Sequence, residues 1–329
     1  MTEVDDEPWS EANAWRRLAR LAPVLPVPVE APQFLPSNSN DAWRLGETIL
    51  RVCWRGDPQR FVKEAALAAS LPLEVGYPEL LAAGEADGLT WALTRRVEGV
   101  TLDRVWLDPD AGRIRAILDD YAHRLQALHA WAPTGEAAAL LHAHAAVSAK
   151  TPAEAVDLDV TPLPVVRAAL LLSPAKALPF VDAGVVDAAW DRMTELFPLD
   201  PFAGPPHARV AHCDATYPNI LVEGARVSAL IDFEWARLAP PWVELVAWIR
   251  LLEDLREEGV CPPVLERLEA SYPAMFDVPR LRERLWLCEL AYTLRHVVFW
   301  PPDAPEGVLS RDHPLHRLRR LIDAPIPWG

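Results

Sequence analysis

The chain has 329 residues, of which 51% are hydrophobic, so it is long enough for two domains with a sizeable core. Its formal net charge of −15 argues against nucleic acid or an anionic membrane as the main partner. No apolar run approaches the ~18 residues of a membrane helix. The four cysteines have no zinc-type spacing, and the acidic start lacks the features of a signal peptide, so we expect a cytoplasmic protein.

The first part of the chain predicts a small α+β lobe. Ser10 is suited to cap a helix that runs to Leu21. Hydrophobic runs separated by turn residues predict about five strands, at 24–31, 41–45, 47–54, 80–84 and 89–95. One helix is inserted at 60–70, and a hinge-like connector follows at 97–99. We therefore expect an antiparallel sheet with one helix, ending near residue 97.

The rest of the chain is predominantly helical. Helical periodicity predicts helices at 113–131, 185–196, 242–257, 264–272 and 281–300, followed by a proline-rich, partly irregular tail. The expected domains are thus a small N-terminal lobe, residues 1–97, and a larger, mainly helical C-terminal lobe, residues 98–329.

One hairpin in the second part carries most of the candidate chemistry. Two β-rich runs, 220–222 and 227–231, flank Gly224. Antiparallel pairing would bring Asn219 and Asp232 to the open end of this hairpin. Asp214 lies five residues before Asn219, on the loop that enters the hairpin. Two carboxylates and an amide are suited to a hard cation that handles phosphate.

The order of these features is specific. A sheet lobe precedes His212-x-Asp214-x4-Asn219, the hairpin and Asp232-Phe233-Glu234. Over roughly residues 25–300 this resembles the aminoglycoside phosphotransferase and choline kinase family, the small-molecule kinases with a two-lobed protein-kinase-like fold. The resemblance implies transfer of the γ-phosphate of ATP to a hydroxyl of a small molecule. It also implies that the N-terminal lobe binds the nucleotide, and that the C-terminal lobe carries the catalytic loop, a metal-binding hairpin and the acceptor site.

The resemblance also implies roles for individual residues. Asp214 would be the catalytic base and His212 would brace its loop, while Asn219 and Asp232 would hold Mg²⁺. Glu64 would pair with a basic residue on the third strand that grips the ATP phosphates. That strand offers Arg51 where the family usually has lysine, and arginine can bind phosphate bidentately.

Other expected nucleotide contacts are less typical of the family. The phosphate-covering loop has no glycine, so Ser37, Ser39 and Asn40 would bind through their side chains. Adenine would meet the backbone from Arg95 to Val97. Cys213 stands where the family usually has glycine.

The acceptor stays open between aminoglycosides, macrolides, choline, ethanolamine, homoserine, sugars and nucleosides. Glu234, Trp235 and Glu244 are candidates for contact with an amine-bearing acceptor, with an ordinary core or surface role as the alternative. A catalytically inactive kinase-like nucleotide- or ligand-binding protein is the main alternative function. A metallohydrolase using His212, Asp214 and Asp232 is a second. The sequence carries no signal for the oligomeric state.

Overall fold

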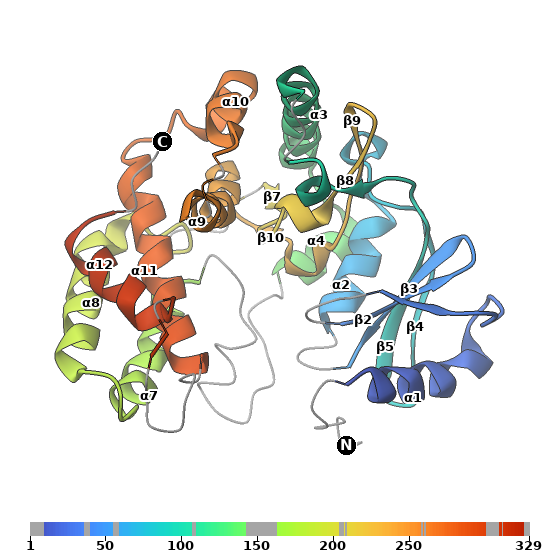
Figure 1. Ribbon diagram of the computed structural model, residues 1–329, viewed down its shortest axis with the longest axis horizontal. Helices are drawn as coiled ribbons and strands as arrows, with labels where there is room; N and C mark the ends of the chain where they lie inside the picture. Colours follow the sequence, from blue (N-terminus) through green and yellow to red (C-terminus); the bar gives the residue numbers. More distant parts are fainter. Residues whose placement is uncertain are drawn as a thin grey trace. The chain divides into compact units, whose positions relative to one another are not determined.

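The computed structural model describes residues 10–35, 40–54, 59–106, 110–142, 163–203, 207, 209–257, 259, 261–300, 309–310 and 312–325. The chain divides into two compact units (Figure 1). The first comprises Met1–Ile117, Pro133–Ala143 and Tyr217–Ala236, and the second comprises Leu118–Ala132, His144–Thr216 and Arg237–Gly329. The predicted hairpin therefore belongs to the same unit as the predicted sheet. The domain boundary at residue 97 stays a prediction.

The first unit contains the predicted antiparallel sheet of five strands, in the order β1-β2-β3-β5-β4. Its strands are β1 (Gln33–Leu35), β2 (Asp41–Leu45), β3 (Thr48–Cys53), β4 (Leu80–Ala86) and β5 (Leu89–Arg95). The prediction for the first strand was wrong, because β1 begins only at Gln33 and residues 24–31 form no strand. Prolines at 23, 26 and 28 remove the N–H donors that such a strand would need.

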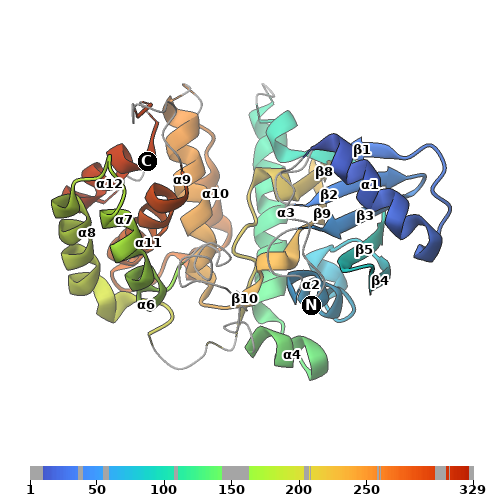
Figure 2. The same cartoon turned by 90° about the horizontal axis from the view of Figure 1, so that it is seen from below.

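Helices cover both faces of this sheet (Figure 2). The helix α1 (Glu11–Leu21) begins at the predicted cap, where Ser10 Oγ accepts the N–H of Asn13 at 3.2 Å. Its buried residues pack with Leu50 and Val52 of β3. Phe61 of α2 (Gln59–Ala68) packs instead with Cys53 and Ala92. Because side chains alternate along a strand, Arg51 belongs to the α2 face of the sheet.

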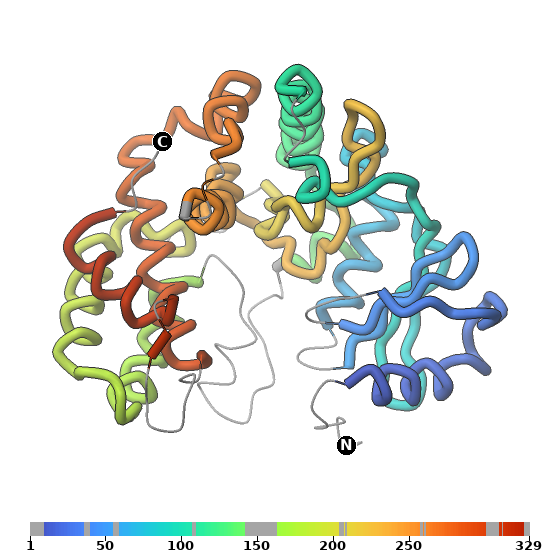
Figure 3. Tube along the Cα trace, viewed as in Figure 1, coloured from blue at the N-terminus to red at the C-terminus, as the bar shows by residue number. Residues whose placement is uncertain are grey.

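The hairpin of the first unit pairs β8 (Ile220–Glu223) with β9 (Arg226–Leu230), and its trace can be followed in Figure 3. Gly224 has a φ of 58° in the two-residue loop between the strands. The N–H of Ile231 donates to the carbonyl of Asn219 at 3.0 Å. Asn219 and Asp232 therefore meet at the open end, as predicted. The short strand β6 (Val100–Thr101) extends the pair beyond β8 and was not predicted.

The second unit is mostly helical. Helix α3 (Ala111–Ala130) enters it from the first unit, which also holds α4 (Gly135–His142). The long helix α11 (Leu281–Phe299) is its core element and buries Leu285, Leu290 and Leu294. The helices that contact it are α6 (Val165–Ala168), α7 (Leu172–Lys176), α8 (Ala183–Leu196), α9 (Glu244–Glu257) and α12 (Pro314–Asp323), and α10 (Val264–Ser271) packs against α9. Two short strands, β7 (Val210–Ala211) and β10 (Arg237–Leu238), pair with each other, and β7 ends immediately before the loop that begins at His212.

The described part of the tail contains a helix, where the sequence predicts a partly irregular segment. Helix α12 begins at Pro314, and His313 Nδ1 accepts the N–H of Leu315 at 3.1 Å. Proline at the first helical position and leucines at 315, 318 and 321 are helix signals that the high proline content obscured. Among the described residues, no helix is both long and apolar enough to span a bilayer.

Candidate active site

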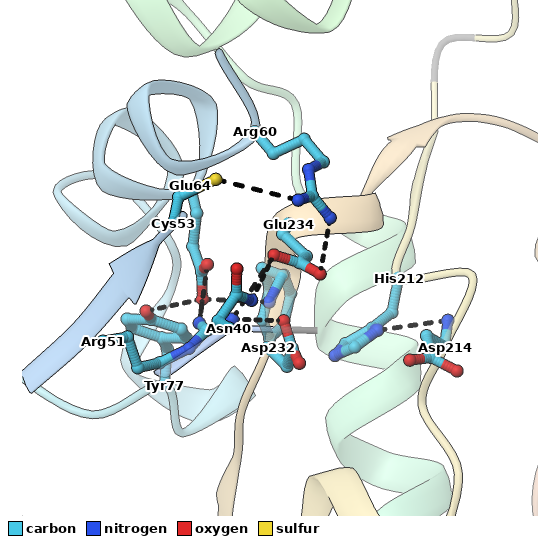
Figure 4. Close-up of polar contacts among 11 residues, drawn as sticks. Asn40, Arg51, Cys53, Arg60, Glu64, Tyr77, His212, Asp214, Asp232 and Glu234 are labelled. Atoms are coloured by element: carbon cyan, nitrogen blue, oxygen red, sulfur yellow. Dashed lines mark hydrogen bonds and ion pairs between the residues drawn. The ribbon is translucent and has the colours of Figure 1, made fainter. Parts of the chain in front are cut away.

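Arg51 and Glu64 form the central contact of the first unit (Figure 4). Nη1 of Arg51 on β3 lies 2.7 Å from both carboxylate oxygens of Glu64 on α2. Glu64 is only 1% exposed. It also accepts the hydroxyl of Tyr77 at 2.9 Å and the N–H of Phe233 at 3.1 Å. The sheet face that carries Arg51 therefore meets the expected helix residue, and the family's Lys–Glu pair is replaced by an Arg–Glu pair.

The same guanidinium reaches the predicted metal ligand. Nη2 of Arg51 donates to Oδ1 of Asp232 at 2.6 Å, and Oε2 of Glu234 lies 3.5 Å away. Asp232 follows β9 in the left-handed region, with a φ of 67°. Burial would lower the pKa of Arg51, but Asp232, Glu64 and Glu234 outweigh it and hold that pKa well above its usual value. Arg51 is therefore a permanent cation that faces three acidic side chains.

Glu234 is less accessible than a residue that contacts the acceptor would have to be. Its side chain is fully buried and accepts Nδ2 of Asn40 at 2.9 Å and Nη1 of Arg60 at 3.0 Å. Burial and the nearby Asp232 raise the pKa of Glu234 to about 7, against the opposing charges of Arg60 and Arg51. Trp235 lies beneath the guanidinium of Arg60, 4.6 Å from its ring centroid. Both residues are thus placed with the expected nucleotide-binding residues.

Asn219 and Asp232 offer part of a metal site. Asn219 ends a 3₁₀ turn, Tyr217–Asn219, and the carboxylate of Asp232 retains 23% exposure. Within the described residues, no group of three or more His, Cys, Asp and Glu side chains is arranged to hold a metal ion. One carboxylate and one amide form an incomplete oxygen shell, which suits Mg²⁺ because that ion keeps waters and phosphate oxygens as further ligands.

The other expected nucleotide contacts are only partly placed. Ser37 and Ser39 lie outside the described residues, while Asn40 is buried beside Glu234. Arg95 donates its backbone N–H to the carbonyl of Glu79 at 2.8 Å, so this donor already serves the sheet. Val97 follows the sheet as a half-buried residue of the connector. An adenine contact at Arg95 or Val97 stays a prediction.

In the second unit, Glu244 holds the loop that carries the candidate base. It is 2% exposed and accepts the backbone N–H of His212 at 2.6 Å and that of Cys213 at 3.0 Å. His129 Nε2 lies 3.4 Å from the same carboxylate. Burial would raise the pKa of Glu244, but the hydrogen bond and charge of His129, together with His212, lower it below its usual value. Its carboxylate therefore binds the loop, although the sequence makes Glu244 a candidate for contact with the acceptor.

The loop has an unusual backbone at Cys213. Its φ is 68°, in the left-handed region that favours glycine, which explains the family's usual residue at this position. The turn directs the N–H of Asp214 toward His212 Nδ1 at 3.3 Å (Figure 4), so His212 braces the loop if its Nδ1 is the acceptor. The N–H of Thr216 donates to the carbonyl of Asp214 at 2.8 Å.

Further support for this loop comes from two residues that the sequence does not single out. The hydroxyl of Tyr121 donates to the carbonyl of Ala215 at 2.6 Å and accepts Nε1 of Trp248 at 3.0 Å. Tyr121 occupies a buried position of the long helix α3, and no local signal distinguishes it from its neighbours. In the same way, Tyr77 and Arg60 of the first unit could not be found from their local sequence.

Residues 30–284 match the model of the phosphotransferase enzyme family, and no curated protein matches the chain. One similar structure is a thermostable mutant of aminoglycoside phosphotransferase APH(4)-Ia with ADP and hygromycin B (17% identity, 90% of this chain and 94% of that chain covered, TM-score 0.59). Another is ADP-bound aminoglycoside phosphotransferase APH(2'')-Ib (14% identity, 95% of this chain and 97% of that chain covered, TM-score 0.59). A third is a choline/ethanolamine kinase family protein from Mesorhizobium loti (16% identity, 95% of this chain and 96% of that chain covered, TM-score 0.60).

These neighbours confirm the predicted kinase-like fold, with its antiparallel sheet and mainly helical remainder. The family match covers well over half of the chain, including β2, β3, α2, the catalytic loop and the hairpin. The protein therefore belongs to the phosphotransferase enzyme family.

Proposed function

We propose that the protein transfers the γ-phosphate of ATP to a hydroxyl of a small molecule. The observation that carries this proposal is the contact of Arg51 with both Glu64 and Asp232, at 2.7 and 2.6 Å. These contacts gather a phosphate-binding cation and a candidate metal ligand within one unit. The ADP in the aminoglycoside phosphotransferase structures supports a nucleotide as the phosphate donor.

Each residue would then have one task. Arg51 would exchange Asp232 for a nucleotide phosphate, which a guanidinium can bind through two parallel hydrogen bonds. Asn219 and Asp232 would hold Mg²⁺, which supplies charge neutralisation to the phosphates. Asp214 would accept the proton of the attacking hydroxyl, while Glu244 and His212 keep its loop in place. We also propose a cytoplasmic location, supported by the four free cysteines.

The test is Asp214→Asn, assayed by ADP release over a panel of hydroxyl acceptors and by calorimetry with Mg·ATP. We expect turnover to fall by about 10²–10⁴-fold, the usual contribution of a general base, with an unchanged Kd for Mg·ATP. Asp191→Asn, an exposed position on α8, is the matched control and should behave as wild type. Equal turnover in Asp214→Asn and wild type would contradict the proposed role.

A nucleotide-binding protein without transfer activity is the alternative. The ion pair between Arg51 and Asp232 favours it, because the pair engages a carboxylate that the metal would need. The two functions differ in a combined experiment. Thermal stabilisation by Mg·ATP with no ADP release from any acceptor would support the alternative, whereas acceptor-dependent ADP release supports the transferase.

A further inference from the structure

The second unit contains a cavity of about 570 Å³, bordered by α9, α11 and α12, the helices labelled in Figure 1. This volume falls within the range of roughly 300–1,000 Å³ that is typical of small-molecule sites. Arg250 lines the cavity and lies on α9, six residues after Glu244, which accepts the backbone N–H groups of His212 and Cys213. The cavity and the loop that carries the candidate catalytic base therefore share one helix of the same unit, and the proposed function requires the acceptor hydroxyl to lie near that base.

One wall of the cavity is aromatic. Tyr292, His296 and Trp300 follow one another at intervals of four residues, so they lie on one side of α11 and its C-terminal end. The ring centroids of Tyr292 and His296 are 4.0 Å apart, and those of His296 and Trp300 are 6.1 Å apart. The guanidinium of Arg250 covers Tyr292 at 3.5 Å. Trp300 is 49% exposed, and its ring can therefore receive the flat face of a ligand.

Most of the charged residues around the cavity form ion pairs with one another, and the exposed Asp312 is the exception among the lining carboxylates that the structure describes. Nη2 of Arg317 lies 2.7 Å from Glu253 and 3.0 Å from the buried Glu289. Glu253 also lies 3.6 Å from Arg320, and Glu289 lies 3.8 Å from Arg250. An organic cation would have to compete with arginines for these carboxylates, and an anion would meet the carboxylates beside every arginine. Such a balanced lining disfavours a ligand with net charge, because buried charge requires a counter-charge of its own.

His296 adds no charge to this lining. Burial, followed by the charges of Arg250, Arg295 and Arg317, lowers the pKa of His296 to about 3. Its ring is therefore neutral at physiological pH and can offer one donor and one acceptor.

Thr293 supplies a further polar group. Its side chain is 1% exposed and lines the cavity, and Oγ1 has no hydrogen-bond partner among the described residues. A buried hydroxyl without a partner is unfavourable, and a bound ligand would satisfy it. A hydroxyl both donates and accepts, so a ligand rich in hydroxyl groups can use the paired arginines, the carboxylates and Thr293 together.

We infer that the acceptor is an uncharged, polyhydroxylated ring compound, of the sugar or cyclitol class, whose apolar ring face stacks on Trp300. The inference rests on the proposed phosphotransferase function for its claim that the ligand is the acceptor. It excludes the amine-bearing acceptors considered from the sequence, since Glu234 and Glu244 bind other groups of the protein. In addition, the three arginines that line the cavity balance the charges of Glu253, Asp254 and Asp312.

Ligand-observed NMR by saturation transfer tests the inference without any need for turnover. The neutral probes are D-glucose, maltose, methyl β-D-galactoside and myo-inositol. Choline and hygromycin B serve as cationic probes, and D-glucuronate as the anionic probe. We expect saturation transfer to at least one neutral probe and no Trp300-dependent transfer to the charged ones. The inference would be overturned if no neutral probe showed saturation transfer, or if only a charged probe showed Trp300-dependent binding.

Two pairs of variants locate the binding. Trp300→Ala should weaken the Kd of the neutral probe by roughly tenfold, while Trp300→Phe keeps a platform and most of the affinity. Thr293→Val should weaken it by roughly three- to tenfold through the lost hydrogen bond, while Thr293→Ser restores it. Phe197→Ala and Thr194→Val change partly or fully exposed residues outside the cavity and are the controls. Unchanged binding in both Trp300→Ala and Thr293→Val would place the ligand elsewhere and overturn the inference.

ADP release with the same probes separates this inference from the proposed function. A neutral probe that binds through Trp300 and is phosphorylated supports both. A neutral probe that binds but stimulates no ADP release supports the ligand class of the cavity and contradicts the transfer reaction. Phosphorylation of choline or hygromycin B, with no binding of neutral probes, supports the transfer reaction and overturns the ligand class.

Discussion

Glu244→Gln should loosen the loop that carries Asp214 while preserving the shape of the buried side chain. The carboxylate accepts two backbone N–H groups of this loop, from His212 at 2.6 Å and from Cys213 at 3.0 Å. A glutamine has one carbonyl oxygen, so its amide group would face one of these two donors. Losing a hydrogen bond to a charged group costs about 1.5–3 kcal/mol, and a buried unpaired donor costs about 1–3 kcal/mol.

These contributions overlap, and we expect the free energy of unfolding to fall by about 3 kcal/mol. For a domain of this size the melting temperature should drop by about 6–12 °C. The loop bears Asp214, so turnover should fall by about 10²-fold, the usual effect of a ~1 Å misplacement, while the Kd for Mg·ATP is unchanged. Glu269→Gln, an exposed position on α10, is the control and should alter none of these quantities.

The pH dependence of stability shows whether the negative charge of Glu244 holds the loop or whether its packing alone does. The pKa of Glu244 is lowered in the folded protein, so its stabilising effect is complete above the ordinary value of 4.5. It is lost as the pH falls through the lowered value. The stability difference between wild type and Glu244→Gln should therefore be constant above pH 4.5 and shrink below it. Thermal unfolding at several pH values measures this. If Glu244→Gln lowered the melting temperature by less than 2 °C, or if the stability difference from wild type were independent of pH, the charge of Glu244 would not hold the loop.

Two further predictions concern the first unit. Arg51→Met should lower its unfolding free energy by about 3 kcal/mol, because Glu64 is left buried without its partner, and should weaken Mg·ATP binding in calorimetry. Arg51→Lys should keep binding within about tenfold of wild type, and equal loss in both variants would contradict a charge role. Gly99→Ala should destabilise this unit in urea unfolding, because its φ is 130° and a Cβ would lie 2.6 Å from the carbonyl oxygen of Val222. Gly46→Ala, with a φ of 59° and no atom near its Cβ, should lose only about 1–2 kcal/mol, and equal losses at both positions would exclude the clash.

The elements that could be predicted from the sequence are those with a local signal. Hydrophobic runs between turn residues predict strands at 41–45, 47–54 and 89–95, and β2, β3 and β5 lie there. The hairpin brought Asn219 and Asp232 together because the antiparallel count fixed its open end. The partnership of Arg51 and Glu64 came from the order of elements that the family shares, and the contact is present.

The contacts that could not be predicted join residues with no local relation. Glu244 lies 32 residues after His212, and Arg60 lies 174 residues before Glu234. A charged residue in a helical pattern is ordinarily solvated, so neither carboxylate could be identified from the sequence as buried. Only the packed structure reveals that Glu244 holds a loop and that Glu234 belongs with Asn40 and Arg60.

The charge balance around Arg51 offers a reason for Asp232 to be the residue that meets a cation. Two guanidinium groups, from Arg51 and Arg60, face the three acidic side chains of Glu64, Asp232 and Glu234. One negative charge is therefore in excess when all three are ionised, in agreement with the raised pKa of Glu234. Glu64 and Glu234 are buried, whereas Asp232 keeps 23% exposure and has one short contact with Arg51. A divalent cation would relieve the excess at Asp232 with the least disruption, and Arg51 would then be free to turn toward phosphate.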